Sequence, residues 1–322
     1  MKKMKIIFEL SGEHPELPRA EVFAVLEGEG ISFEGAYSRE RFLVMDLDTE
    51  DIGFINRLAM TKKAARLVAL TGNIRKAGLE IAKEIPREKT IAVRSKSHTL
   101  EEELGAELFV LGYHADLEKP DVKILCFDID SKYLCGVDIP MKRDFNQRRP
   151  QFRPFFHPTS MHPKLARVLV NLARVKEGDV LLDPFCGTGG ILIEAGLIGL
   201  EIKGSDIDEK MVKGCEKNLE SLNLKGELNK ADALRLDSGE VDAIVTDPPY
   251  ARSSYVTEKN LEDFYKKFLS NAFNILRHRG YLVLVVPKKY PLDIGKFSLI
   301  EEFDFRVHKS LTRKIFVTRK FC

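Results

Sequence analysis

The sequence predicts an α/β protein whose C-terminal half forms a mostly parallel sheet with an antiparallel hairpin at its end. In that half, short apolar segments of strand length alternate with longer segments of helical periodicity, as in a sheet with helices on both faces. The first third shows shorter strands and helices instead. A chain of 322 residues is longer than one hydrophobic core usually serves, so we expect more than one domain.

The N-terminal part is predicted to hold two small units. The first has expected strands at 5–10, 42–47 and 65–70 and expected helices at 17–26 and 51–59. We interpret it as the β-α-β-β-α-β order of a ferredoxin-like unit, of which these segments supply three of the four strands. The second has expected helices at 74–84 and 99–111 and expected strands at 90–95, 122–128 and 133–137. Its second helix opens on Thr99-Leu-Glu-Glu, a capping-box pattern.

A linker and a longer βα series are predicted next. Residues 144–157 are rich in Pro, Arg and aromatic residues and have no period, which is typical of a linker. Beyond it we expect strands near 179–183, 202–205, 227–230, 241–246 and 281–286, helices at 161–174, 189–198, 208–222 and 258–276, and a hairpin of 303–308 with 314–318. The predicted boundaries are therefore 1–72, 73–143, a linker at 144–157, and 158–322.

Composition excludes several classes of protein. Hydrophobic residues at 44% and charged residues at 31% are typical of a globular chain rather than a disordered one. No apolar run approaches the length of a membrane span, so we expect a cytoplasmic protein with no membrane partner. The spacing of the five cysteines matches no metal site, so we expect free thiols and no metal. The absence of Trp beside abundant Lys, Arg and Glu favours a thermophilic source.

A glycine-rich loop carries the first chemical signal. Residues 180–190 (VLLDPFCGTGG) place an apolar strand, an acid, a glycine loop and the start of a helix in series. Such loops hold nucleotide-like cofactors at the carboxyl ends of strands, because glycine lets the backbone approach the ligand. Asp183 precedes the glycines and would repel a pyrophosphate, so it favours an ammonium-bearing ligand such as S-adenosylmethionine. We expect Asp183, Phe185, Gly187 and Gly189 to bind it; the alternative is a plain strand–helix turn.

Two further acids follow the next two strands. Asp206 lies near the ~20-residue offset at which an acid meets a ribose diol. Asp232 could accept a hydrogen bond from an adenine amino group. Their neighbours Ile207 and Ala233 are expected to line the same site. Each acid could instead cap a helix or a turn.

The most specific motif is Asp247-Pro248-Pro249-Tyr250 after the fourth strand. The prolines fix φ and remove two N–H donors, so their carbonyls are held rigidly beside the Asp247 carboxylate. Two fixed acceptors can hold the two hydrogens of an exocyclic amino group, and Tyr250 offers a face on which a base can stack. We predict that these four residues are catalytic.

Together these motifs resemble the Rossmann-like amino-methyltransferases, in which a glycine loop precedes (Asn/Asp/Ser)-Pro-Pro-(Tyr/Phe). Residues 183–190, 247–250 and 153–163 (RPFFHPTSMHP) are similar to archaeal tRNA guanosine N2-methyltransferases that act at tRNA position 10. That family carries a ferredoxin-like unit and a THUMP domain before its catalytic domain, so the resemblance covers essentially the whole chain. Ala251 departs from the Gly that usually follows the Tyr.

The resemblance implies an enzyme that adds one or two methyl groups to N2 of a guanosine in tRNA. We also expect a monomer. Asp247 and the Pro248 carbonyl would orient the amino group of a flipped base. His157, Met161 and His162 would close over the cofactor; the alternative is that they serve only helix entry and packing. The resemblance leaves open whether a small activator protein binds, as it does to related eukaryotic enzymes.

Two basic clusters are expected to contact RNA phosphates, although the net charge is only +2. The expected contacts are Arg148, Arg149, Arg153, Lys309, Arg313 and Lys314. A solvated basic face is the alternative. For the whole chain the alternatives are guanosine methylation elsewhere in tRNA or rRNA, adenine N6 methylation, a nicotinamide oxidoreductase, and a non-catalytic RNA-binding protein.

Overall fold

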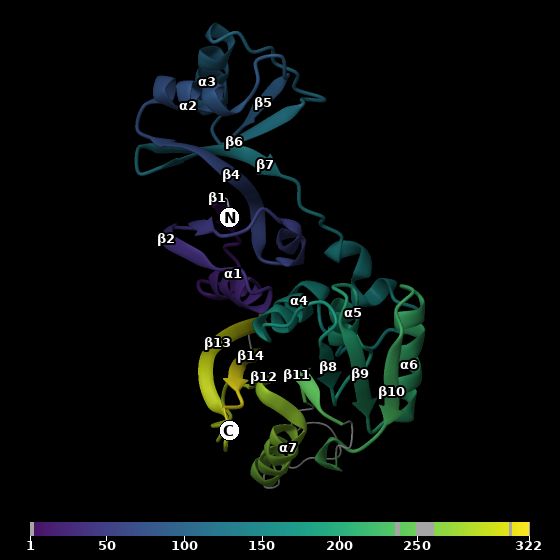
Figure 1. The fold of residues 1–322 in the computed structure, drawn as a ribbon. Helices are drawn as coiled ribbons and strands as arrows, with labels where there is room; N and C mark the ends of the chain where they lie inside the picture. Colours follow the sequence, from purple (N-terminus) through teal and green to yellow (C-terminus); the bar gives the residue numbers. More distant parts are fainter. Residues whose placement is uncertain (1–2, 236–238, 249–260, 309–310, 322) are drawn as a thin grey trace. The chain divides into compact units, whose positions relative to one another are not determined.

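The computed structural model describes residues 3–235, 239–248, 261–308 and 311–321 (Figure 1). Two compact units share the chain. The first comprises residues 1–12, 31–55 and 61–142, and the second comprises 13–30, 56–60 and 143–322. None of the described helices is long and apolar enough to cross a membrane.

The first unit is built on a seven-stranded sheet of order β2-β3-β1-β4-β7-β6-β5. Its strands are β1 (Met4–Leu10), β2 (Phe33–Arg39), β3 (Phe42–Leu47), β4 (Thr61–Thr71), β5 (Ile91–Arg94), β6 (Val122–Ile129) and β7 (Lys132–Ile139). Helices α2 (Ile74–Glu84) and α3 (His98–Val110) pack on it through a core that includes Ile81, Leu104 and Leu108. The pairing of β4 with β7 joins the strands of both predicted small units, so the boundary at residue 72 stays a prediction.

Three local features of this unit differ from expectation. The exposed edge strand β2 was not predicted, because its sequence lacks a clear apolar alternation. Residues Gly53–Arg57 form a short 3-10 turn instead of the helix expected at 51–59; the Asp51 carboxylate caps it by accepting from Gly53 N at 2.8 Å. Ser97, not Thr99, caps α3, and its hydroxyl accepts from Leu100 N at 3.3 Å.

The cysteines also correct an expectation. Cys126 and Cys135 occupy paired positions on β6 and β7 and form a disulfide, whereas the sequence predicted free thiols. Antiparallel pairing brings these residues together, although nine positions separate them in the sequence. Cys186 and Cys215 are free and buried.

The second unit contains the sheet β10-β9-β8-β11-β12-β14-β13. Its strands are β8 (Val180–Asp183), β9 (Glu201–Asp206), β10 (Gly226–Lys230), β11 (Val241–Thr246), β12 (Leu276–Pro287), β13 (Ser298–His308) and β14 (Leu311–Arg319). Strands β8 to β12 pair in parallel, and β14 and β13 pair antiparallel. The predicted fold class, a mostly parallel sheet with an antiparallel C-terminal hairpin, is confirmed.

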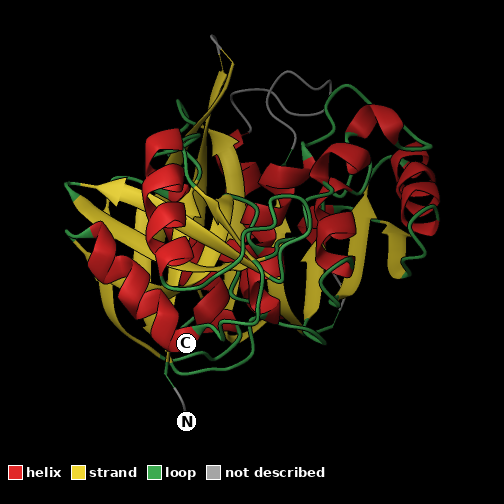
Figure 2. Cartoon of the chain, turned by 90° about the horizontal axis from the view of Figure 1, so that it is seen from above, coloured by secondary structure: helices red, strands yellow, loops and turns green. Residues whose placement is uncertain are grey.

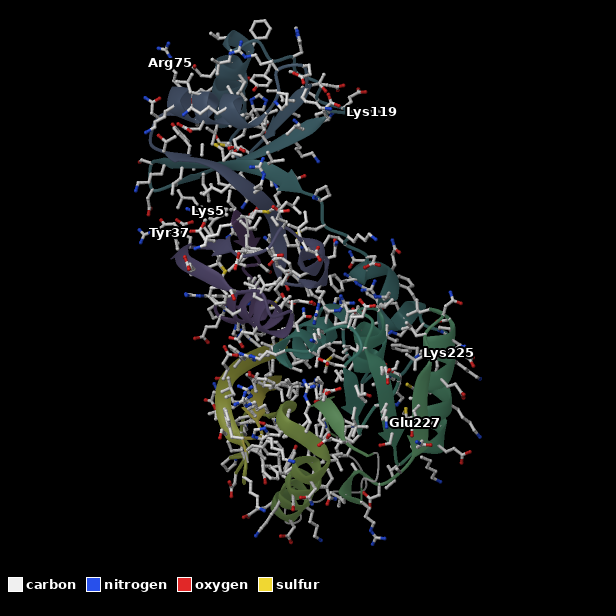
Figure 3. All side chains as sticks on the ribbon, in the orientation of Figure 1. Lys5, Tyr37, Arg75, Lys119, Lys225 and Glu227 are labelled. Atoms are coloured by element: carbon white, nitrogen blue, oxygen red, sulfur yellow. A yellow bond between two sulfur atoms is a disulfide. The ribbon has the colours of Figure 1, made fainter. Side chains whose placement is uncertain are left out.

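Helices pack on both faces of this sheet through two apolar cores; Figure 2 shows the helices of the chain in red and its strands in yellow. Helices α4 (Pro163–Leu172), α5 (Gly190–Gly196) and α6 (Glu209–Glu220) share one apolar core, and α7 (Leu261–Ile275) contributes to another. At the β10 edge, Lys225 and Glu227 are exposed (Figure 3). Charged side chains on an edge strand disfavour pairing with a second sheet.

Helix α1 (Leu17–Gly28) belongs to the second unit, although its sequence lies within the predicted N-terminal domain. It packs against α4. The Glu21 carboxylate of α1 is fully buried and accepts from Ala59 N, Met60 N and the Asn171 amide at 2.7–2.8 Å. Burial raises the pKa of Glu21 more than these hydrogen bonds lower it. The hydrogen bond to Asn171 connects α1 to α4.

The predicted linker is folded into the second unit. It forms two 3-10 turns, Phe145–Arg148 and Pro150–Phe152. Phe155 lies against α6, where any side chain at Gly214 would clash with its ring. Residues 144–157 therefore lack a periodic sequence pattern because their contacts with the second unit are irregular. They are not a separate, unpacked linker.

Candidate active site

Three acids lie at one edge of the second sheet, where parallel strands end. Asp183 ends β8, Asp206 ends β9 and Asp247 follows β11. The charges of Asp206 and Asp247 both raise the pKa of Asp183, so the three carboxylates lie within electrostatic reach of one another. We call Asp183, Asp206 and Asp247 the acidic edge.

Asp183 is the most buried of these acids, with 2% of its surface exposed. One carboxylate oxygen accepts from the Thr246 hydroxyl at 2.7 Å and from Phe185 N at 3.2 Å. Burial raises the pKa of Asp183 to about 7, because it outweighs these two hydrogen bonds. The side chain would be stabilised as an anion by a cationic ligand.

The loop after Asp183 needs its glycines. Gly187 and Gly189 have φ of +50° and +80°, a region that favours glycine. A Cβ at Gly189 would also lie 2.6 Å from the buried Cys215 sulfur. The loop therefore keeps a bare backbone where α5 begins.

Asp206 is tied to this loop. Its carboxylate accepts from Gly187 N at 3.0 Å and from Asp208 N at 2.9 Å. Burial raises the pKa of Asp206. The next residue, Ile207, is 58% exposed and offers an apolar surface beside the acid.

Asp232 follows β10 and is exposed. It accepts from Leu234 N at 3.0 Å at the start of the short turn Ala233–Arg235. This hydrogen bond caps the turn, which is the alternative role that the sequence suggested for Asp232. Ala233 is buried in the apolar core beneath α7. A cofactor-binding role for both residues stays a prediction.

Asp247 pairs with Arg313 of β14. The Arg313 guanidinium donates to one Asp247 oxygen at 2.5 Å, and the two side chains are 15% and 16% exposed, respectively. Pro248 is buried. Pro249 and Tyr250, which the sequence also predicts to be catalytic, lie outside the described residues.

Aromatic side chains of α7 surround the same strand ends. Phe185 of the loop packs on Phe264 and Phe268, with ring centroids 5.8 and 5.4 Å apart. Tyr265 is 1% exposed, and its hydroxyl has no hydrogen-bond partner among the described residues. Burial raises the pKa of Tyr265 and the charge of Asp247 adds to the effect, so this hydroxyl stays protonated beside Asp247.

The segment before α4 lies close to the glycine loop. Met161 lies within 3.6 Å of the position that a Cβ on Gly190 would take. The Ser160 hydroxyl is hydrogen-bonded to the Thr188 hydroxyl at 2.9 Å. His157 is hydrogen-bonded to the Thr159 hydroxyl at 2.8 Å, and His162 caps α4 through Lys164 N. Met161 is therefore near the loop, whereas local contacts account for the described hydrogen bonds of both histidines.

Two of the arginines predicted to contact RNA are buried instead. Arg148 and Arg153 are 7% and 8% exposed. Arg148 donates to both oxygens of Glu194 at 2.9 and 3.2 Å, and Arg167 donates to the same carboxylate at 2.9 Å. Arg153 donates to the Arg148 carbonyl. We call Arg148, Arg153, Arg167 and Glu194 the arginine cluster; its guanidinium groups are not available as surface phosphate contacts.

The other predicted RNA contacts differ among themselves. Arg149 is exposed, as expected of a phosphate contact. Lys314 forms an ion pair with Glu302 at 2.8 Å, and Arg313 faces Asp247. Lys309 lies outside the described residues. Among the described residues, no group of three His, Cys, Asp or Glu side chains is placed to hold a metal ion.

The sequence interpretation missed Thr246, Tyr265, Glu194 and the pairing of Arg313. Thr246 is the one detectable case, since it is a hydroxyl residue at the end of an apolar strand next to the motif. Tyr265 on α7 and Arg313 on β14 are distant from the motifs in sequence, and the packing of α7 and the sheet order bring them to the strand ends. Glu194 follows the glycine loop directly, but its arginine partners come from other segments.

Comparison with known proteins places these features in context. A family model described as "RMKL-like, methyltransferase domain" matches residues 150–314. A tRNA (guanine(10)-N2)-dimethyltransferase from Methanothermobacter thermautotrophicus is 40% identical, over 98% of this chain and all of that protein. A second, from Methanocaldococcus jannaschii, is 33% identical over 97% of this chain and 98% of that protein. The crystal structure of TrmN from Thermus thermophilus is similar, with a TM-score of 0.57 at 22% identity over 99% of this chain and all of that one.

Proposed function

The chain belongs to the family of tRNA (guanine(10)-N2)-dimethyltransferases, and from this premise we propose that it methylates N2 of guanosine 10 in tRNA with S-adenosylmethionine. The observation that carries the proposal is the acidic edge. There a glycine loop with a buried acid follows β8, and an Asp-Pro-Pro motif follows the adjacent strand β11.

The residues at β8 and β9 fit the cofactor. A buried carboxyl group with a pKa of about 7 suits the ammonium group of the methionine part, and would oppose the pyrophosphate of a nicotinamide cofactor. Asp206 would accept from the ribose hydroxyls, and exposed Ile207 would contact the adenine. When bound, the cofactor supplies a methyl group on a positively charged sulfur.

The residues at β11 fit the base. Asp247 is held near the Thr246–Asp183 hydrogen bond by the strand it follows, and Pro248 is buried beside it. The Asp247 carboxylate and the Pro248 carbonyl would accept from the two N–H groups of guanine N2. This contact would aim a weakly nucleophilic nitrogen at the methyl group, which is the main task in a displacement reaction.

The test is methylation of a tRNA transcript followed by nucleoside mass spectrometry. We expect N2-methylguanosine and N2,N2-dimethylguanosine from position 10 and no product from a transcript with inosine at that position. Inosine is the matched control because it lacks only the exocyclic amino group. Product from the inosine transcript at the wild-type level would contradict the assigned position.

A binding experiment tests the cofactor independently of RNA. Calorimetry should detect S-adenosylmethionine and no binding of NAD, and the reverse result would overturn the assignment. The expectations of a monomer, a cytoplasmic location, a thermophilic source and an optional activator protein stay predictions.

A further inference from the structure

Arg313 lies beside the proposed catalytic acid, and the sequence had assigned it to RNA phosphates. We propose that Arg313 is a positioning residue that holds the Asp247 carboxylate for the incoming amino group. This inference rests on the proposed function, because it concerns the same site.

The sheet order explains how a residue so distant in sequence reaches Asp247. Strand β14 pairs antiparallel with β12, and Arg313 is opposite Pro287 at the carboxyl end of β12. Strand β11 flanks β12 on its other side. The Arg313 side chain therefore spans the end of β12 to meet the residue that follows β11.

The alternation of side chains along β14 places Arg313 on the face that packs toward β11. On β14, Ile315 and Val317 share the face of Arg313 and pack in the core that includes Val245 of β11. Asp247 follows Val245 by two positions, just beyond the end of β11, and its ion pair with Arg313 brings the two side chains together there. The ion pair is thus an extension of the apolar packing between β11, β12 and β14.

The contact is strong enough to orient the carboxylate. Both side chains are about one-sixth exposed, so solvent screens the 2.5 Å ion pair less than it would screen a surface pair. Holding one oxygen of a planar carboxylate also restricts the position of the other. A carboxylate that is preset in this way loses less freedom when it accepts from the substrate.

The neighbouring lysine shows that positive charge alone does not place a side chain here. Lys314 projects to the opposite face, where it pairs with Glu302 at 2.8 Å. A suitable control is Lys288, which lies at the same end of β12, pairs with Asp304 at 2.7 Å and is 53% exposed. Lys288→Ala removes one positive charge from this end of the sheet but leaves Arg313, the partner of Asp247, in place.

The first experiment compares Arg313→Ala, Arg313→Lys and Lys288→Ala in single-turnover assays with tRNA and S-adenosylmethionine both saturating. We expect Arg313→Ala to lower the rate on the order of 100-fold, as displacement of a reacting group does. Arg313→Lys should recover part of the loss, because lysine restores the charge without the planar geometry. Lys288→Ala should react at the wild-type rate. The dissociation constants of tRNA and cofactor should be nearly unchanged in all three.

Two results would overturn the proposal. One is an unchanged rate for Arg313→Ala. The other is a loss confined to tRNA affinity, with a smaller salt dependence, which would return Arg313 to a phosphate contact.

A double-mutant cycle separates positioning through Asp247 from any independent role. In an Asp247→Asn background, Arg313→Ala should change the rate little, and a further loss on the order of 100-fold would contradict the proposal. Thermal unfolding gives a readout that needs no activity: Arg313→Ala should lower the midpoint in the wild-type background more than in Asp247→Asn. If the wild-type protein methylates no guanosine, the proposed function fails, while the thermal cycle still decides whether the two residues are coupled.

Discussion

The second unit contains two concentrations of charge, the acidic edge and the arginine cluster, and they are built in opposite ways. The acidic edge brings Asp183, Asp206 and Asp247 to the ends of parallel strands, and Arg313 pairs with one of them. In the arginine cluster, Arg148 and Arg167 both pair with Glu194, which is 0% exposed. The exposed side chain of Asp144 also pairs with Arg148.

This contrast separates charges that a ligand can neutralise from charges that the fold itself neutralises. At the acidic edge, burial raises the pKa of Asp183, which shows that its surroundings do little to stabilise the carboxylate. A cationic cofactor could supply the missing positive charge. In the arginine cluster, the guanidinium groups of Arg148 and Arg167 both pair with Glu194. The same two groups lie 5.2 and 5.9 Å from the centroid of the Phe145 ring. The cluster holds the segment before α4 against α5, and its charge is internal to the fold.

Arg148→Ala should have the strongest effect, a loss of stability. Removal of one partner of a buried ion pair leaves Glu194 undercompensated, which typically costs about 3–5 kcal/mol of unfolding free energy. Denaturant unfolding measures it. Arg149→Ala is the matched control. Arg149 is exposed, so this substitution should change the unfolding free energy by less than about 0.5 kcal/mol. Equal stability of the two variants would remove the distinction between the cluster and the surface.

At the acidic edge the largest effect should be on turnover, from Asp247→Ala. We expect at least a ~100-fold loss in single-turnover rate, the size typical of a positioned catalytic group. Cofactor affinity should hold, because the glycine loop is untouched. Asp247→Asn should retain more activity, since its amide oxygen can still accept from the amino group. A near-normal rate for Asp247→Ala would make the motif a structural turn.

Asp183→Asn should weaken cofactor binding by about 1.5–3 kcal/mol, the range for hydrogen bonds to a charged group. Asn keeps an acceptor for Thr246 and Phe185 but loses the charge. In the wild-type protein, affinity should fall as the pH drops below about 7, because Asp183 is then protonated. Calorimetry from pH 6 to 8 measures both effects, and an identical pH dependence in Asp183→Asn would exclude this carboxyl as the cause.

The same shift predicts a change in the stability of the cofactor-free protein. Folded Asp183 holds its proton more tightly than the unfolded chain does, because its pKa rises from 3.8 to about 7. Its contribution therefore favours folding at low pH and is lost as the pH rises through about 7. Asp183→Asn should flatten that part of the stability curve, and an unaltered curve would argue against the raised pKa.

The smallest expected effect is that of Arg149→Ala on tRNA affinity. Loss of one phosphate contact should weaken binding uniformly across sequences and reduce the slope of log affinity against log salt by about one. A filter-binding titration over a salt series measures it. An unchanged slope would leave Arg149 as a solvated surface charge.

Local patterns in the sequence predict several parts of this protein correctly. Strand β11 lies at the predicted 241–246 and α2 at the predicted 74–84. The order of strands and helices in the second unit, the glycine loop and the three strand-end acids follow in the same way. Periodicity, φ restrictions and strand ends depend on residues within one or two turns of each other, so a single sequence displays them.

Which charged groups meet depends on long-range packing and cannot be read from one sequence. Arg313 and Arg148 look alike in sequence, each in a basic stretch, yet one faces Asp247 and the other Glu194. The assignment of α1 to the second unit and the Cys126–Cys135 pairing arise in the same way. These contacts depend on strand order and on which face of an element is buried. Both are set by the packing of segments far apart in the chain, because burial raises the cost of an unpaired charge and thereby selects its partner.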